Sequence, residues 1–118
     1  MNIESFREYC LKKKGSEETY PFDETTLVFK VMNKMFALTD LESIPLWINL
    51  KCDPEKAMEL RERYESVQPG YHMNKKYWNT IILDNTIPDR EVYSWIDDSY
   101  NLIVESLKKK DRELLDKM

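Results

Sequence analysis

Residues 26–39, TLVFKVMNKMFALT, contain the pattern that decides the fold. Every second side chain from Leu27 to Val31 is large and apolar, which is the two-residue period of a β-strand. The polar residues Asn33 and Lys34 follow, and a second β-prone segment comes after them. Two such segments joined by a short polar link predict a β-hairpin whose tip carries Asn33 and Lys34.

Helical and strand periods alternate outward from this hairpin along the rest of the chain. Gly15 is a stop signal for the first helix, and Asp53-Pro54 supplies an N-cap and an N1 proline for the second. Pro88 precedes the third and longest helical pattern. The predicted helices cover residues 3–14, 54–66 and 89–108, and the predicted strands cover residues 19–22, 26–32, 34–39, 46–51 and 77–83.

This succession, α-β-β-β-β-α-β-α with short links, predicts an α+β fold in which helices flank an antiparallel sheet. A chain of 118 residues is long enough for one hydrophobic core. We therefore predict a single domain over residues 1–108. Residues 109–118 are highly charged with one apolar pair, and are interpreted as a C-terminal extension, either helical or frayed.

Composition limits the classes of function. The chain is 42% apolar and 34% charged, with a formal net charge of −4. It has no apolar run near the ~20 residues that span a bilayer and no amino-terminal signal pattern, so a cytoplasmic protein without membrane contact is predicted. The two cysteines, Cys10 and Cys52, have no partners at zinc-like spacing and are interpreted as reduced core thiols.

Recognisable catalytic motifs are missing. With only two glycines the chain cannot form a glycine-rich phosphate loop, and no GxSxG motif occurs. The single histidine, His72, could serve acid-base chemistry, but no local pattern pairs it with a cysteine nucleophile. We therefore predict a protein that is not an enzyme and that needs no cofactor and no metal.

One segment, residues 71–79 (YHMNKKYWN), gathers cations, amides and aromatic rings within nine residues. Lysines can contact phosphates, and ring faces can stack on bases, so this mixture is typical of a nucleic-acid contact. The alternative is structural: Trp78 would point into the core while Lys75 and Lys76 cover its edge.

The same segment resembles the MmcQ/YjbR family. Further parts of the resemblance are 21–22 (PF), 27–31 (LVFKV), 34–38 (KMFAL), 49–54 (NLKCDP), 69–80 (PGYHMNKKYWNT) and 96–100 (IDDSY), so it covers nearly the whole chain. The resemblance implies a CyaY-like fold and a DNA-binding role through a proposed double-wing motif. The fold also suggests iron binding, which the lysines at the end of the first helix disfavour.

Together these observations predict a non-enzymatic, monomeric protein that docks on the phosphates of double-stranded DNA. The alternative is a protein-interaction or small-ligand-binding module with no nucleic-acid role, in which residues 71–79 line a groove. The predicted nucleic-acid-binding residues are Lys34, His72, Asn74, Lys75, Lys76, Trp78 and Asn79.

Overall fold

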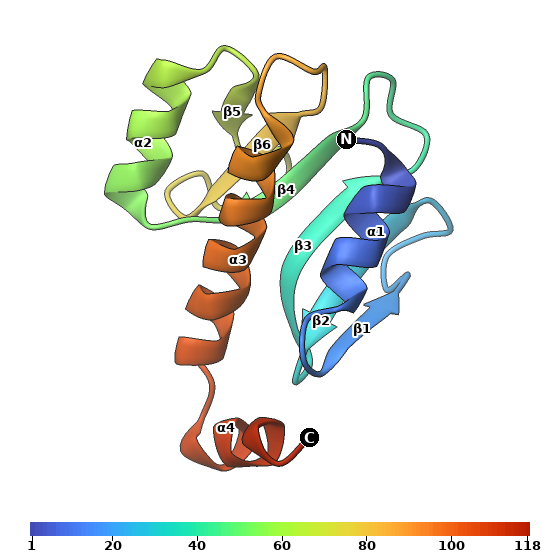
Figure 1. Ribbon diagram of the computed structural model, residues 1–118, viewed down its shortest axis with the longest axis vertical. Helices are drawn as coiled ribbons and strands as arrows, with labels where there is room; N and C mark the ends of the chain where they lie inside the picture. Colours follow the sequence, from blue (N-terminus) through green and yellow to red (C-terminus); the bar gives the residue numbers. More distant parts are fainter.

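Six antiparallel strands form one sheet in the order β1-β2-β3-β4-β6-β5 (Figure 1). The structure is a computed structural model and describes all residues 1–118. The strands are β1 (Ser16–Thr19), β2 (Thr26–Val31), β3 (Lys34–Asp40), β4 (Trp47–Lys51), β5 (Val67–Pro69) and β6 (Trp78–Ile82). The helices are α1 (Ile3–Leu11), α2 (Pro54–Arg63), α3 (Asp89–Glu105) and α4 (Lys109–Asp116). The predicted α+β class with an antiparallel sheet is confirmed.

The central hairpin forms as predicted, but its tip is shifted by one residue. Met32 and Asn33 both adopt positive φ angles, 48° and 67°, which suits a two-residue turn between right-twisted strands. Val31 then pairs with Lys34, so Lys34 opens β3 instead of lying in the turn.

A β-bulge in the same hairpin changes which side chains of β3 face the helices. Phe29 pairs with Ala37 and Lys30 pairs with Met35, which leaves Phe36 as the extra residue. Phe36 and Ala37 are both fully buried in the main core. Strict alternation would have placed them on opposite faces of the sheet.

Helices α1, α2 and α3 all contribute to the main core on one face of the sheet. Phe6 of α1, Leu60 of α2 and Ile96 of α3 belong to that single cluster. The opposite face, which we call the open face, carries only a small cluster made by Val28, Leu38 and Trp78, with two methionines beside it. None of the four helices combines the length and the apolar character needed to cross a lipid bilayer.

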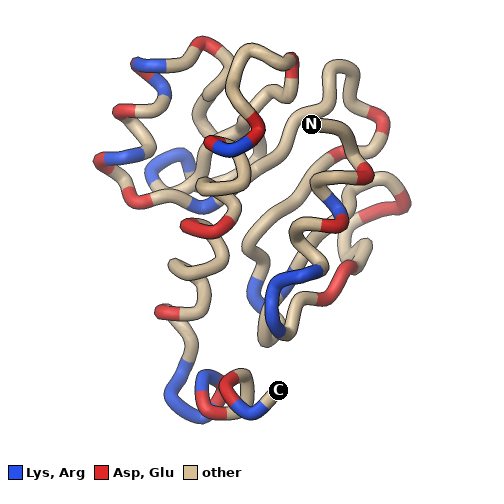
Figure 2. Tube along the Cα trace, viewed as in Figure 1, with Lys and Arg blue, Asp and Glu red and all other residues tan.

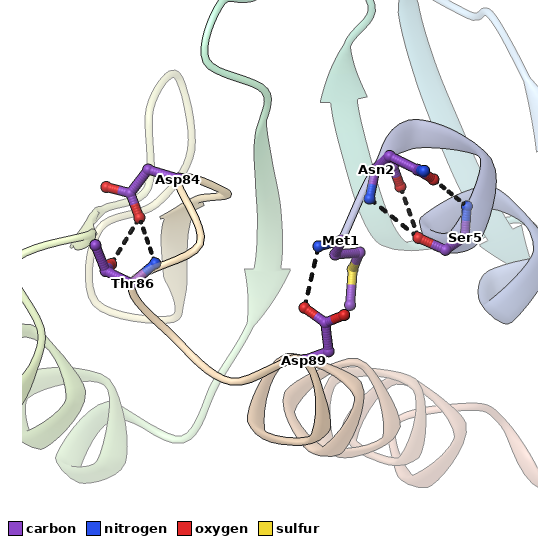
Figure 3. A network of polar contacts seen from close by, with 6 residues as sticks. All are labelled: Met1, Asn2, Ser5, Asp84, Thr86 and Asp89. Carbon is purple, nitrogen blue, oxygen red and sulfur yellow. Dashed lines mark hydrogen bonds and ion pairs between the residues drawn. The ribbon is translucent and has the colours of Figure 1, made fainter.

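Polar contacts fix the start of α1. At the start of α1, the Asn2 side chain accepts from the Ser5 backbone and the Ser5 hydroxyl accepts from the Asn2 backbone, which forms a capping box. The amino-terminal ammonium of Met1 lies 3.0 Å from Asp89 Oδ1 in the first turn of α3 (Figure 3). The contact between Met1 and Asp89 ties the beginning of α1 to the beginning of α3, although these two residues are 88 positions apart in sequence.

The structure corrects several predicted element boundaries. The first strand is β1, three residues earlier than the predicted 19–22, because Ser16–Thr19 pairs with β2 along a polar edge that has no apolar alternation. Helix α2 ends at Arg63, three residues early, since Tyr64 is already extended. The chain then forms the unpredicted strand β5 against β6. Helices α1 and α3 also end three residues before the predicted 14 and 108.

The predicted C-terminal extension contains a further helix, α4, instead of a frayed tail. Its Leu115 is only 3% exposed and belongs to the main core. A β-carbon built on Gly15 would lie 2.6 Å from Leu115 Cδ1, so the glycine also makes room for this contact. Gly15 has a positive φ of 72°, which favours glycine for a second reason.

Candidate functional site

Backbone hydrogen bonds close the loop that connects β5 to β6, residues 70–77. Gly70 N donates to Trp78 O at 2.9 Å and Met73 N donates to Gly70 O at 3.1 Å. The Lys75 ammonium donates to the same Gly70 carbonyl at 3.1 Å. His72 sits at φ 59°, in the left-handed region. This loop therefore has a defined conformation between β5 and β6.

Two of the predicted nucleic-acid contacts, Trp78 and Asn79, are buried in this structure. Trp78 is 8% exposed and packs against Val28 and Leu38. The Asn79 side chain is also buried: its Oδ1 accepts from Arg61 Nε at 2.7 Å and its Nδ2 donates to Ala57 O at 3.3 Å. Strand β6 lies between β4 and β5 and is covered on both faces at these positions, so neither side chain can stack on a base or contact a phosphate.

The five other predicted residues, Lys34, His72, Asn74, Lys75 and Lys76, are exposed but do not form one cluster. Lys34 begins β3, and its ammonium donates to the Ser106 carbonyl at 3.2 Å, beyond the end of α3. Lys75 and Lys76 precede β6, which the whole of β4 separates from β3. These lysines lie at the same end of the sheet, but the hydrogen bonds of Lys34 and Lys75 hold their ammonium groups on backbone carbonyls.

Sequence reasoning missed Lys51, the last residue of β4. The ammonium groups of Lys51 and Lys76 lie 5.9 Å and 5.5 Å from the centre of the Tyr77 ring, which is 39% exposed. Both distances fall within the ~6 Å range of a cation–π contact. We call Lys51, Lys76 and Tyr77 the basic cluster.

Outside the basic cluster, lysines also form two runs, Lys12–Lys14 and Lys108–Lys110, and the other cations are dispersed over the fold. Figure 2 shows Lys and Arg segments interleaved with Asp and Glu segments along most of the trace. Several cations are already paired: Arg7 with Glu18 at 2.6 Å and Lys56 with Asp98 at 2.8 Å, while Lys13 pairs with Asp97. In the Arg7 pair, the hydrogen bond from the guanidinium lowers the pKa of the Glu18 carboxyl.

The open face of the sheet carries two adjoining hollows, of about 480 Å³ and 470 Å³. They share Asp40, Trp47 and Tyr71. The first hollow is completed by Phe22, Asp23, Thr26, Leu38, His72 and Met73. The second is completed by Gln68, Pro69, Thr80 and Ile82. The rings of Trp47 and Tyr71 meet edge to face, with centroids 5.7 Å apart.

A buried polar pair positions Tyr71 between the two hollows. Asn49 is fully buried, and its Nδ2 donates to the Tyr71 carbonyl at 2.9 Å. The Tyr71 amide donates to Thr80 Oγ1 at 2.8 Å, and the Thr80 hydroxyl donates to Asn49 Oδ1. Asn49 and Thr80 were not among the predicted site residues. The available signal was that each places a polar side chain at the middle of a strand.

Two carboxylates lie in the walls of the first hollow. Asp23 accepts from the backbone amides of Thr25 and Thr26, at 2.9 Å and 2.6 Å, and these bonds lower the pKa of its carboxyl. Asp40 Oδ1 accepts from the Glu42 amide at 2.9 Å. Neither hollow has a lysine or an arginine in its wall.

The thiols are poorly suited to nucleophilic chemistry. Cys10 and Cys52 are both buried and unpaired. Burial raises the pKa of both thiols, that of Cys52 to about 11, and nucleophilic cysteines need the opposite shift. No group of three or more His, Cys, Asp and Glu side chains is placed so that it could hold a metal ion.

Comparison with known proteins connects this architecture to a family. The sequence model of the YjbR family matches residues 11–102, which span β1 to β6 and most of α3. The chain belongs to the YjbR family. The MmcQ/YjbR resemblance predicted from the sequence is therefore confirmed.

Relatives and solved structures agree with this membership. The chain is 35% identical to the uncharacterized protein YjbR of Escherichia coli K12 over 116 residues, which is 98% of each chain. It is 37% identical to the uncharacterized protein YbdF of Escherichia coli O157:H7, over 93% of this chain and 90% of the relative. A crystal structure of a Deinococcus radiodurans protein with a DUF419 domain matches with a TM-score of 0.91 and 42% identity, over 97% of this YjbR-family chain and 87% of the other. The crystal structure of a Pseudomonas syringae protein matches with a TM-score of 0.75 and 30% identity. The match covers 86% of this chain and 98% of the other.

Proposed function

We propose that this YjbR-family protein binds a small organic molecule in the hollows on the open face of its sheet and performs no chemistry on it. The observation that carries the proposal is the pair of adjoining hollows around Trp47 and Tyr71. Each volume falls within the roughly 300–1,000 Å³ typical of small-molecule sites, and the walls combine aromatic and aliphatic side chains with a few polar groups, as such sites do.

The rigidity of the site supports binding. Exposed aromatic side chains on a free loop would lose conformational freedom when they hold a ligand. Here the backbone of Tyr71 is fixed on both sides by the Asn49–Thr80 pair before any ligand arrives. The absence of an activated nucleophile is the reason for proposing binding without catalysis.

The proposal is tested by NMR titration of the ¹⁵N-labelled protein with a neutral probe, 3,3-dimethylbutan-1-ol. We expect the shifts to concentrate at the Trp47 indole N–H and at the Tyr71 and Thr80 amides. Tyr71→Ala should weaken these shifts, because the ring forms part of both walls. Tyr77→Ala is the matched control: this tyrosine lies in the same loop and is also exposed, but it lines neither hollow. Shifts scattered over the surface, or equal shifts in the Tyr71→Ala variant, would refute the proposal.

A second candidate function is the DNA binding that the family resemblance implies. The observation in its favour is the basic cluster, where two ammonium groups flank one exposed ring. Lysine ammonium groups beside an exposed aromatic ring can contact phosphates and stack on bases without reading sequence. This candidate uses Lys51, Lys76 and Tyr77 and does not use the hollows, so the two functions can be tested separately.

A further inference from the structure

The walls of the two hollows have an unbalanced charge. They contain the carboxylates of Asp23 and Asp40 and no lysine or arginine. Asp40 belongs to both hollows, and the hydrogen bonds to Asp23 favour its ionised form. The walls also include the one histidine of the chain, His72. The site therefore presents negative charge to whatever enters it.

The aromatic side chains also favour a positively charged ligand. Phe22, Trp47 and Tyr71 contribute rings to the first hollow, and Phe22 is 65% exposed and Tyr71 55% exposed. The face of an aromatic ring is negative and attracts cations within about 6 Å, most strongly for organic ammonium groups that shed water easily. A neutral apolar ligand would use the rings but would leave the negative charge of the two carboxylates unbalanced.

The lysines of β3 and β4 lie at the strand ends remote from Asp40 and Trp47. Asp40 is the last residue of β3, whereas Lys34 is the first residue of the same strand. In the antiparallel neighbour β4, Trp47 comes first and Lys51 last. The carboxylate and aromatic residues thus lie toward one end of these strands, and the basic cluster lies at the other.

From these observations we infer that the hollows select a small organic cation, a quaternary ammonium or protonated amine of the size of choline. The cationic head contacts the Trp47 and Tyr71 rings, and Asp40 balances its charge. This inference rests on the proposed ligand-binding function and specifies the chemical class of the ligand.

The test compares three probes of one shape and three charges: choline (positive), 3,3-dimethylbutan-1-ol (neutral) and 3,3-dimethylbutanoate (negative). Dissociation constants are measured at pH 7.5 from the Trp47 indole shift. We expect choline to bind about fivefold or more tightly than the alcohol, because the cation–π contact with the rings and the attraction to the Asp40 carboxylate each contribute roughly a twofold to threefold factor. The anion should bind most weakly.

Two variants and one control separate the contributions of the charge and of the ring to binding. Asp40→Asn keeps the oxygen that accepts from the Glu42 amide but removes the charge, so the preference for choline should fall to about twofold or less. Glu42→Gln removes one charge two residues away, outside the walls, and should leave the preference unchanged. Tyr71→Leu keeps an apolar side chain but removes the ring, so it should weaken the binding of choline more than the binding of the alcohol. Thermal melts check that each variant is folded.

The outcomes distinguish the inference from the function on which it rests. If the alcohol shifts Trp47 and Tyr71 as strongly as choline does, or if Asp40→Asn leaves the preference intact, the cation inference is wrong while the ligand site stands. If none of the three probes shifts these residues, both are wrong.

Discussion

A buried polar side chain, Ser99, joins two strands at a point where their own hydrogen bonds end. Ser99, in the middle of α3, is fully buried. Its hydroxyl donates to the Phe36 carbonyl at 2.6 Å and accepts from the Lys51 amide at 2.8 Å. The paired ladder between β3 and β4 ends at Ala37 and Leu50, so the hydroxyl joins the two strands where their own hydrogen bonds stop.

This placement predicts the effect of Ser99→Ala. The substitution leaves a partly buried backbone N–H and a buried carbonyl without their side-chain partner, and should lower the free energy of unfolding by about 1 to 3 kcal/mol. Chemical denaturation monitored by circular dichroism measures the change. Ser94→Ala, at an exposed position of the same helix, should change stability by less than about 0.5 kcal/mol. Equal effects of the two substitutions would show that the Ser99 bridge is unimportant.

At the scale of secondary-structure elements, α4 connects a charged segment to the core. Its two adjacent leucines differ sharply in exposure: Leu115 is 3% exposed and Leu114 is 46% exposed. The chain on either side is dominated by charged residues, so one apolar side chain anchors the element. A helix held in this way should depend strongly on that single contact.

The matched pair Leu115→Ala and Leu114→Ala tests this dependence. Removing the buried side chain leaves a cavity beside Gly15 and should cost about 2 kcal/mol or more, within the range for a large-to-small change in a core. The exposed neighbour should cost less than about 0.5 kcal/mol. Thermal unfolding measures both, and amide hydrogen exchange of Lys109–Asp116 reports whether α4 has detached. Similar small losses for both variants would mean that α4 contributes little to the stability of the domain.

At the scale of the whole molecule, a net charge of −4 opposes association with a polyanion unless positive charge is concentrated locally. The basic cluster is the one place where two lysines share an exposed aromatic ring. Lys34 and Lys75, which the sequence pattern suggested as contacts, already donate to carbonyl groups. The proposed DNA binding is therefore expected to depend on Lys51 and Lys76.

The dependence on Lys51 and Lys76 can be measured through the salt dependence of DNA affinity, which reports counterion release. Each phosphate neutralised on duplex DNA contributes about 0.9 to the slope of log affinity against log salt, so the double variant Lys51→Ala/Lys76→Ala should flatten the slope by about 2. The double variant Lys109→Ala/Lys110→Ala changes the net charge equally on α4 and should leave the slope nearly unchanged. Fluorescence anisotropy with unrelated duplexes at several salt concentrations measures all three proteins. A parent protein that does not bind even at low salt would eliminate this second candidate function.

The sequence by itself determined the fold class, the central hairpin and the family. Alternating apolar residues in 26–39 and the helical stripe that includes Ile96 reflect burial on one face of an element, which depends mainly on local spacing. The predicted helices and most strands therefore formed within a few residues of their expected bounds. Short polar elements such as β1 and β5 gave no such signal, because edge pairing with a neighbour stabilises them.

Only the tertiary structure decided which residues reach the surface together. Trp78 and Asn79 have the chemistry of nucleic-acid contacts, but the position of β6 inside the sheet buries both. The candidate ligand site joins Asp40, Trp47 and Tyr71, which become neighbours only when β3, β4 and the loop before β6 meet on the open face. A one-dimensional pattern records the period of each strand, whereas the order of the strands, the bulge at Phe36 and the fold of the loop depend on contacts between residues far apart in the chain.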